Sequence, residues 1–285
     1  MNCSYRTKNG KTCNNLVITG SKYCSNESHY PSKKEFQELL LKKQNEFISE
    51  RESTKNYIVK DVKGDGACLF RCLSNALFIL SGNDLFKVKE IIDKTGYFNY
   101  PNFLKEYLDI AECLMTDDYE LDEDVEEEIA RGIQSTIVNY VRSNSKLKIM
   151  DEMTLEDLIL FCHEIDIETY LKNYERFAGE NDFLIEKITT DNGKIRIKKV
   201  EIDDRWGGIP ELKVFCLLFN FNLIIYGTQK FNIKTMKPEN TSKINDETYF
   251  KIIDKIESGK EDSIPFNLLL REFKIGSHYD YLIKK

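Results

Sequence analysis

The spacing of apolar residues divides the chain into a long helical part and a later part rich in strands. Helical periodicity begins after Ser32, which forms a capping-box pattern with Glu35, and continues to about residues 51–53. The run 69–80 is apolar at nearly every position, which predicts a buried helix. Further helical patterns cover 85–114, 124–143, 154–162, 166–178 and the segment from Pro210 to about Asn220.

Strand patterns become frequent toward the C-terminus. The candidates are 57–62, 184–189, 194–202, 223–226, 249–253, 266–270 and 278–283. Asn192 and Gly193 separate two alternating runs, which is a strong hairpin signal. Since most helices precede most strands, we expect an α+β fold, or an α/β fold with a small sheet under helices.

The charge balance narrows the classes of partner. The 285 residues include 41 Lys or Arg and 48 Asp or Glu, a net charge of −7, which argues against broad binding to nucleic acid. The first 60 residues differ, with eleven basic against six acidic side chains. The acidic run 117–128 fits a solvated loop and helix start, or less often a partner site. No apolar run could span a membrane or serve as a secretory leader, so we expect an intracellular protein.

One cysteine stands at a junction between a glycine-rich turn and a helix. Residues 64–68 read Gly-Asp-Gly-Ala-Cys, and the apolar run 69–80 follows at once. A thiolate at Cys68 would face the unpaired N–H groups and the positive dipole end of this helix, and the same N–H groups can hold an oxyanion. Gly64 and Gly66 allow positive φ or a close backbone approach. A buried structural cysteine that opens a core helix fits the segment equally well.

Three histidines could serve such a thiol as a base. His278 and Asp280 are two residues apart in a predicted strand, so their side chains share a face and Asp280 can orient the imidazole. His163 ends an apolar helical stretch and is expected to be a partly buried helix residue. His29 lies among the N-terminal cysteines. Taken alone, residues 278–280 also fit a polar edge strand.

Three segments, in this order, resemble the signature of the ovarian-tumour (OTU) cysteine proteases. Residues 65–71, Asp-Gly-Ala-Cys-Leu-Phe-Arg, match the family's Asp-Gly-x-Cys-Leu-Phe-Arg without departure. Residues 206–212, Trp-Gly-Gly-Ile-Pro-Glu-Leu, resemble its Trp-Gly-Gly-x-x-Glu-Leu segment, and 278–280 resemble its His-aromatic-acid element. The resemblance spans about residues 57–285. It implies a papain-like α+β fold with a small central β-sheet between helical layers.

The same resemblance implies roles for particular residues. Cys68 would be the nucleophile, His278 the general base and Asp280 the orienting acid, while Asp65 would shape the oxyanion loop. It implies cleavage of ubiquitin or a ubiquitin-like modifier after its C-terminal Gly-Gly, with no cofactor in catalysis.

Substrate contacts are expected around the tail of the modifier. Gly66, Ala67 and Gly207 would line a narrow groove that admits glycines, and Trp206 and Tyr279 would wall it. Core packing is an equally good interpretation of Trp206. The hairpin 184–202 is longer than the link expected there, and either a modifier contact or a neutral insertion accounts for it.

The N-terminus contains a second group of cysteines. Cys3, Cys13, Cys24 and His29 offer the thiolates and imidazole that tetrahedral zinc prefers. Thirty residues with few apolar side chains cannot build a core, so a structural zinc would explain their order. A disordered tail with reduced thiols is the alternative. The local basic excess would suit a nucleic acid or an acidic protein face, and elsewhere no nucleic-acid partner is expected.

We therefore expect a zinc knuckle over 1–31, a helix and linker over 32–56, and a catalytic domain over 57–285. Two other functions stay open: a catalytically silent ubiquitin-binding module, and a cysteine hydrolase of small amides. Abundant Lys, Ile and Asn are typical of AT-rich genomes, such as those of large DNA viruses or protist parasites. For a viral protein, the substrates would be host conjugates in the host cytoplasm.

Overall fold

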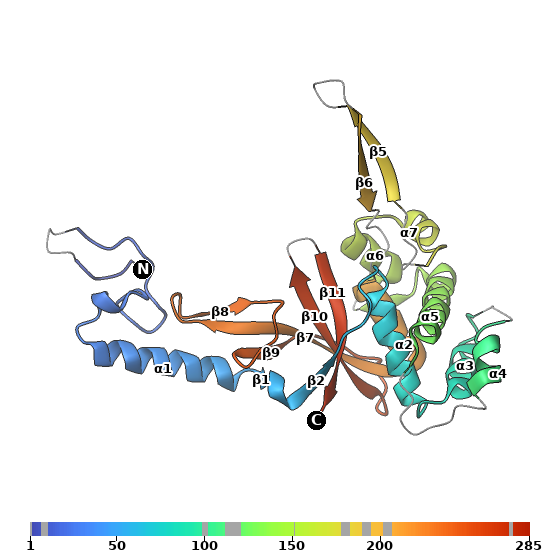
Figure 1. Cartoon of the computed structure of the whole chain (residues 1–285), viewed down its shortest axis with the longest axis horizontal. Coiled ribbons are helices and arrows are strands. Elements are labelled where there is room, and N and C mark those ends of the chain that lie inside the picture. Colours follow the sequence, from blue (N-terminus) through green and yellow to red (C-terminus); the bar gives the residue numbers. More distant parts are fainter. Residues whose placement is uncertain are drawn as a thin grey trace.

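The computed structural model describes residues 2–6, 11–98, 102–111, 121–150, 152–177, 183–189, 195–201, 207–273 and 276–285. Helices pack on a single curved sheet, and two small hairpins stand apart from it (Figure 1). The α+β class expected from the order of helical and strand patterns is confirmed. Among the described residues, no helix combines the length and apolar content that crossing a bilayer requires.

The sheet has seven strands within the described residues. Its order is β1-β9-β7-β10-β11-β2, with β8 paired to β7. All neighbouring strands are antiparallel except β7 and β10, which are parallel. The strands are β1 (Glu52–Ser53), β2 (Tyr57–Lys60), β7 (Phe221–Asn232), β8 (Lys237–Asn240), β9 (Thr248–Ile256), β10 (Ile264–Phe273) and β11 (Gly276–Lys284).

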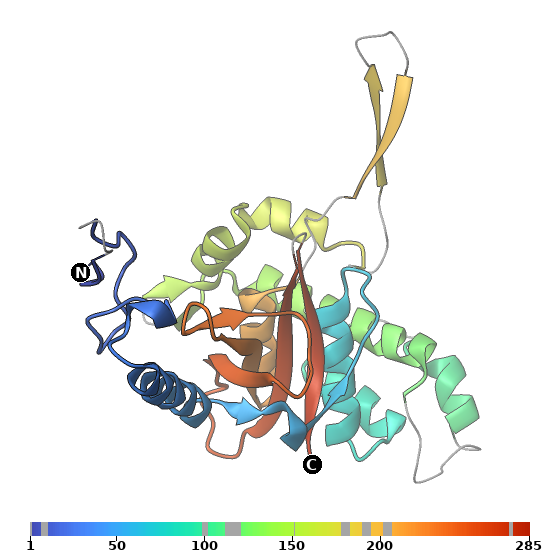
Figure 2. The ribbon, with the colours of Figure 1, turned by 60° about the vertical axis from the view of Figure 1, so that its left-hand side comes forward.

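The main core lies between one face of this sheet and the helices. Helices α2 and α8 pack on the sheet, through β11 and through β7 and β9 respectively, and α5 packs on both helices (Figure 2). α2 is buried on almost every side, as its uniformly apolar sequence predicts. The helices of this part are α2 (Cys68–Leu80), α3 (Leu85–Lys94), α4 (Lys105–Ala111), α5 (Glu123–Asn144), α6 (Leu155–His163), α7 (Ile167–Asn173) and α8 (Ile209–Phe219). A smaller cluster on the opposite face comprises Tyr57, Tyr226, Phe250, Leu269 and Leu282.

The N-terminal region is attached to the far end of the sheet. A 3-10 turn, η1 (Glu27–His29), leads into α1 (Lys33–Ser49), and Ser32 caps α1 by accepting the Glu35 N–H at 3.2 Å, as predicted. Phe47 of α1 packs against Phe231 of β7 and Tyr249 of β9. After α1, β1 and a second 3-10 turn, η2 (Thr54–Asn56), lead into β2. Residues 32–56 are therefore packed onto the sheet and do not form a free tether.

Two pairs of strands lie outside the main sheet. β3 (Lys148–Met150) pairs with β4 (Met153–Thr154), and β5 (Phe183–Thr189) pairs with β6 (Ile195–Glu201) in antiparallel register. The β5–β6 hairpin projects away from the body of the molecule (Figures 1 and 2). Its predicted pairing is confirmed, while the predicted turn at Asn192 and Gly193 lies outside the described residues.

Candidate active site

The loop between β2 and α2 presents Cys68 as the first residue of the helix. Gly66 has φ +87°, a conformation that an L side chain rarely adopts, so the turn requires glycine here. Asp65 Oδ1 accepts the Ala67 N–H at 3.1 Å and closes this turn. Cys68 is only 8% exposed, and the first-turn N–H groups of α2 have no intrahelical acceptor. These N–H groups can stabilise negative charge beside the sulfur.

Arg71 holds the opposite side of this loop. Its guanidinium is fully buried and forms ion pairs with Asp65, with Glu126 at 3.3 Å and with Glu127 at 2.8 Å. Burial raises the pKa of Glu126, and its hydrogen bond with Asn75 and the charge of Arg71 oppose that rise. The turn before Cys68 is thus fixed to α5 by a buried ionic network, and the two glutamate partners could not be predicted from the sequence.

His278 reaches the same place from β11, more than two hundred residues later in the chain. Its Nε2 lies 2.9 Å from Asp280 Oδ1, and because an ionised carboxylate only accepts, Nε2 must donate. Hydrogen bonds with Asp280 and with the Cys68 side chain raise the pKa of His278 to about 10. Since Nε2 is occupied by Asp280, Nδ1 is the nitrogen left for the thiol. Gly64 lies beside the ring, where a Cβ would sit 3.7 Å from Nδ1.

Asp280 is completely buried. Its Oδ1 accepts the Val62 N–H at 3.1 Å in addition to His278, and its Oδ2 pairs with the guanidinium of Arg271 from β10. Burial alone would raise the pKa of Asp280, but the hydrogen bond with His278 and the charges of His278 and Arg271 lower it below its ordinary value. Asp280 is therefore an ionised acceptor, as an orienting acid must be. Arg271 was not anticipated from the sequence.

Tyr279 lies between these two residues on β11. Its backbone N–H donates to Cys68 Sγ at 3.4 Å, while its side chain is partly buried against the main core. Burial raises the pKa of its hydroxyl. The backbone of β11 thus contacts the sulfur directly, in addition to the side chain of His278.

The glycine pair that precedes α8 lies against the helix that begins at Cys68. A Cβ at Gly207 would come within 2.6 Å of Leu69 Cδ2, so only glycine fits this approach. Trp206 lies outside the described residues. Gly66 and Ala67, the other expected groove residues, form the turn directly before Cys68.

Glu211 fixes the start of α8 from inside the protein. It is fully buried and accepts from Gly208 N–H at 2.7 Å, from the Tyr170 hydroxyl at 2.7 Å and from His163 Nε2 at 3.2 Å. Burial lowers the pKa of His163, but the bond and charge of Glu211 outweigh it and raise the pKa above its ordinary value. His163 is mostly buried, in line with the prediction, and it is one of the groups that hold the Gly207–Gly208 turn.

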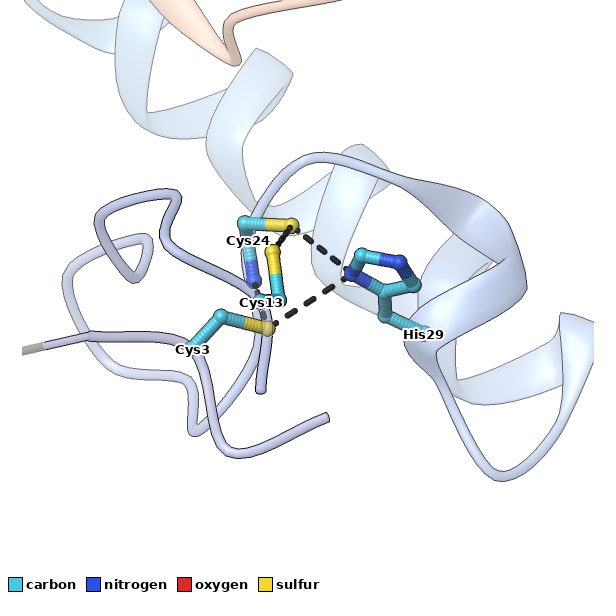
Figure 3. A group of neighbouring side chains, drawn as sticks. All are labelled: Cys3, Cys13, Cys24 and His29. Atoms are coloured by element: carbon cyan, nitrogen blue, oxygen red, sulfur yellow. Dashed lines mark hydrogen bonds between the residues drawn. The ribbon is translucent and has the colours of Figure 1, made fainter. Parts of the chain in front are cut away.

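The N-terminal cysteines and His29 converge in one cluster (Figure 3). The ligand atoms of Cys3, Cys13, Cys24 and His29 all lie within 4.8 Å of one another. Cys24 Sγ is 3.0 Å and Cys3 Sγ 3.6 Å from His29 Nδ1, and Cys13 and Cys24 have sulfurs 3.9 Å apart. Two thiolates on a tetrahedral zinc are about 3.8 Å apart, from Zn–S bonds of about 2.3 Å. Hence the donor set and spacing are compatible with a structural metal.

Aromatic contacts hold this cluster to the rest of the chain. Tyr5 stacks on the His29 ring with centroids 4.0 Å apart, which fixes the orientation of the imidazole. Ile18 packs with Phe36 of α1 and with Met236 from the turn between β7 and β8. The cluster is therefore docked on the protein through a small apolar core of its own.

A cavity of about 390 Å³ lies elsewhere, between α5 and the segment after α7. Arg131, Gln134 and Phe177 are among its lining residues, and neither Cys68 nor His278 contributes to it. This cavity is therefore separate from the junction of α2 and β11, where Cys68 and His278 meet. A thiol at a helix N-terminus, an imidazole in hydrogen-bonding contact with it and a buried carboxylate behind the imidazole can together perform nucleophilic acyl transfer.

Comparisons with known proteins give similarity at the level of structure. No protein-family model matches the sequence, and no curated protein matches it by sequence. The chain is similar to the structure of h/ceOTUB1 with ubiquitin aldehyde and UBC13~Ub, at 14% identity and TM-score 0.42, covering 86% of this chain and 82% of that one. It is also similar to the structure of a ceOTUB1 ubiquitin aldehyde UBC13~Ub complex, at 15% identity and TM-score 0.43, covering 86% of this chain and 85% of that one. A third similar structure is the OTU domain of OTUD1, at 14% identity and TM-score 0.34, covering 89% of this chain and 100% of that one.

Proposed function

We propose that this protein is a deubiquitinating cysteine isopeptidase, which cleaves ubiquitin or a ubiquitin-like modifier from lysine side chains or from chains. The observation that carries the proposal is the meeting of Cys68 at the start of α2 with His278 and Asp280 on β11. These residues are far apart in sequence, and a purely structural cysteine needs neither an imidazole nor a buried acid behind it.

The reaction follows from the contacts of these side chains. Cys68 Sγ attacks the carbonyl carbon of the modifier's last glycine, and the thiol proton passes to His278. The hydrogen bonds with Asp280 and Cys68 raise the pKa of His278, so the imidazole is a suitable acceptor for this proton. The tetrahedral oxyanion is held by N–H groups at the start of α2 and in the 64–67 turn. The imidazolium then protonates the departing lysine amine. Water, deprotonated by His278, attacks the thioester and releases the modifier's carboxylic acid.

The substrate class rests on the three sequence motifs and on the glycine content of the site. Gly66 is held at positive φ, and Gly207 touches Leu69 so closely that a methyl group would not fit. We propose that the glycine backbones at these positions border a narrow channel, which would suit a Gly-Gly tail and exclude tails with side chains. Trp206 and Tyr279 are proposed as its walls, and the β5–β6 hairpin as an additional contact with the modifier.

The test is covalent capture by ubiquitin with a C-terminal electrophile. The wild-type protein should form one adduct, which Cys68→Ala and His278→Ala abolish. Cys162→Ser is the matched control, because Cys162 is an exposed thiol on α6 and should not react in its place. Capture that persists in Cys68→Ala would reject this site. Capture without hydrolysis of any linkage-defined ubiquitin chain would favour a modifier-binding module, and hydrolysis of small amides alone would favour the other alternative.

We further propose that Cys3, Cys13, Cys24 and His29 bind one structural zinc ion, with no part in the chemistry. On this proposal, residues 1–31 form a zinc knuckle, 32–56 connect it to the sheet, and 57–285 form the catalytic domain. Metal analysis of the purified protein should give one zinc per chain, and Cys24→Ser should reduce this sharply. We place the protein in the reducing cytoplasm, where its thiols stay reduced.

A further inference from the structure

Arg271 is the charged group that stands directly behind the proposed catalytic acid. It lies on β10 opposite His278 of β11, and its side chain is 20% exposed. Its guanidinium pairs with Asp280 Oδ2 on its inner side and with Asp61 Oδ1 on its outer side. Asp61, which is 75% exposed, belongs to the segment that follows β2. One arginine therefore bridges a fully buried carboxylate and a surface carboxylate.

Asp280 is held on both of its oxygens by groups from different elements. Oδ1 accepts the His278 Nε2–H and the backbone N–H of Val62, and Oδ2 forms an ion pair with the guanidinium of Arg271. Val62 and Asp61 are adjacent and begin the loop that continues through the 64–67 turn to Cys68. Thus the loop is attached to Asp280 twice, directly through Val62 and indirectly through Asp61 and Arg271.

We propose that Arg271 is a positioning residue of the proposed reaction, which locks the Asp280 carboxylate in line with His278 Nε2 and ties the loop before Cys68 to that carboxylate. The inference rests on the proposed function, and its test below works without the proposed substrate.

The physical reason is that a carboxylate held by one oxygen can rotate about its Cβ–Cγ bond. A guanidinium presents several N–H donors in a rigid plane, and here they can engage Asp280 and Asp61 at once. The titratable and charged side chains that contact His278 or Asp280 from other elements are Cys68 of α2 and Arg271 of β10, and Asp61 of the loop pairs with the outer side of Arg271. With Oδ2 occupied, Oδ1 remains available to hold the imidazolium.

The experiment compares Arg271→Met, Arg271→Lys and Asp61→Asn with the wild type. Arg51→Met is the matched control, because Arg51 precedes β1 and also has a buried side chain, 3% exposed. It stacks on Phe47 and donates to Gln229 of β7, away from Cys68, His278 and Asp280. The probe is iodoacetate. Alkylation of Cys68 is followed by mass spectrometry of its peptide across pH. Iodoacetate is an anion and is attracted by the imidazolium of His278. Its reaction with Cys68 therefore slows when His278 loses its proton, and the upper pH limit of the reaction reports the pKa of His278.

Positioning predicts that Arg271→Met shifts this upper limit to lower pH, because a carboxylate that is no longer aligned stabilises the imidazolium less. Turnover of a ubiquitin conjugate should fall about tenfold to a hundredfold in kcat with KM little changed, as expected for losing the charged partner of the orienting acid. Arg271→Lys should recover part of both losses. Asp61→Asn should change kcat by no more than about threefold, because exposed ion pairs are weak.

Two results would overturn the inference. One is that the upper pH limit of alkylation stays in place or rises in Arg271→Met. That would show that Arg271 acts only through its positive charge, which lowers the pKa of His278, so that removing the charge raises that pKa. The other is an equal shift in Arg51→Met, which would show a general effect of destabilising the sheet. If no ubiquitin conjugate is cleaved by the wild type, the proposed substrate fails, and the iodoacetate profile still decides the role of Arg271.

Discussion

The buried pair of His163 and Glu211 offers the sharpest test of how the glycine turn before α8 is held. His163→Gln removes the positive charge and keeps an amide that can donate to Glu211. In the wild type, the pKa of His163 is raised and that of Glu211 lowered, in both cases because each charge is bonded to the other against the cost of burial. The raised pKa of His163 stabilises the folded state below about pH 6.5 and this contribution is lost as pH rises through the folded value. The lowered pKa of Glu211 stabilises it above about pH 4.5, and that contribution is lost as pH falls.

The size of the effect can be worked from the contact distance. At 3.2 Å, a full charge pair in an effective dielectric constant of about 20 interacts with about 5 kcal/mol, and desolvation offsets most of it. Tyr170 and Gly208 continue to donate to Glu211 in the variant. We therefore expect His163→Gln to lower the free energy of unfolding by about 1–2 kcal/mol between pH 5 and 6.5, the cost of one charge-assisted hydrogen bond. This corresponds to a fall of about 2–8 °C in Tm.

Urea unfolding followed by tryptophan fluorescence measures this loss, because Trp206 is the single tryptophan and is two residues from Gly208. A double-mutant cycle with Glu211→Gln isolates the coupling between the two side chains. The coupling energy should be largest near pH 5.5 and should be smaller at pH 9, because this contribution is lost as the pH rises through the raised pKa of His163. A coupling energy that is the same at both pH values would refute the ion pair and leave only a neutral hydrogen bond.

Three other perturbations give expected outcomes of different kinds. Gly207→Ala should lower the free energy of unfolding by about 1–3 kcal/mol and slow capture by electrophilic ubiquitin, because the new methyl group would overlap Leu69. In Gly208→Ala the nearest atom is 3.7 Å from the new methyl group, so the loss of stability should be smaller. Equal losses of stability in urea unfolding would contradict the close approach at Gly207. Arg71→Met should destabilise the fold by more than about 3 kcal/mol at neutral pH. The loss should be smaller near pH 4, because Glu126, whose pKa burial raises, can be neutralised by a proton once the guanidinium is gone; a penalty independent of pH would contradict the network. Metal removal, by chelation or by Cys13→Ser, should speed hydrogen exchange in residues 11–40 and leave β7 and β10 protected; unchanged exchange would contradict a structural metal.

The elements that could be predicted from the sequence are those that local physics specifies. Ser32 precedes α1 as its cap, the uniformly apolar run gives the buried helix α2, and the runs around Asn192 and Gly193 pair as β5 and β6. The long pattern 85–114 was less informative, because it covers two helices. α3 ends at Lys94, and Gly96 has φ +72°, which stops the helix.

The elements that were missed depend on contacts between distant residues. β1 has two residues and exists because Glu52 and Ser53 pair with β9, which no local pattern reveals. β8 likewise forms only because the chain turns back on β7. Nothing in the sequence around Arg271 indicates a contact with Asp280. That contact depends on the register of β10 and β11, which places Arg271 opposite His278. Sequence motifs therefore identify the residues proposed to react with the substrate better than the residues that position them.

The two polar networks have complementary effects on the loop that carries Cys68. On one side, Arg71 attaches Asp65 to α5, and on the other, Asp280 receives Val62 from the beginning of the same loop. Moving the loop would break the ion pair of Asp65 with Arg71 and the hydrogen bond from Val62 to Asp280, and both contacts are made to buried charged groups. These contacts therefore fix the loop from both sides. In the proposed reaction, its N–H groups would need no rearrangement to receive an oxyanion, which is the condition under which such donors are most effective.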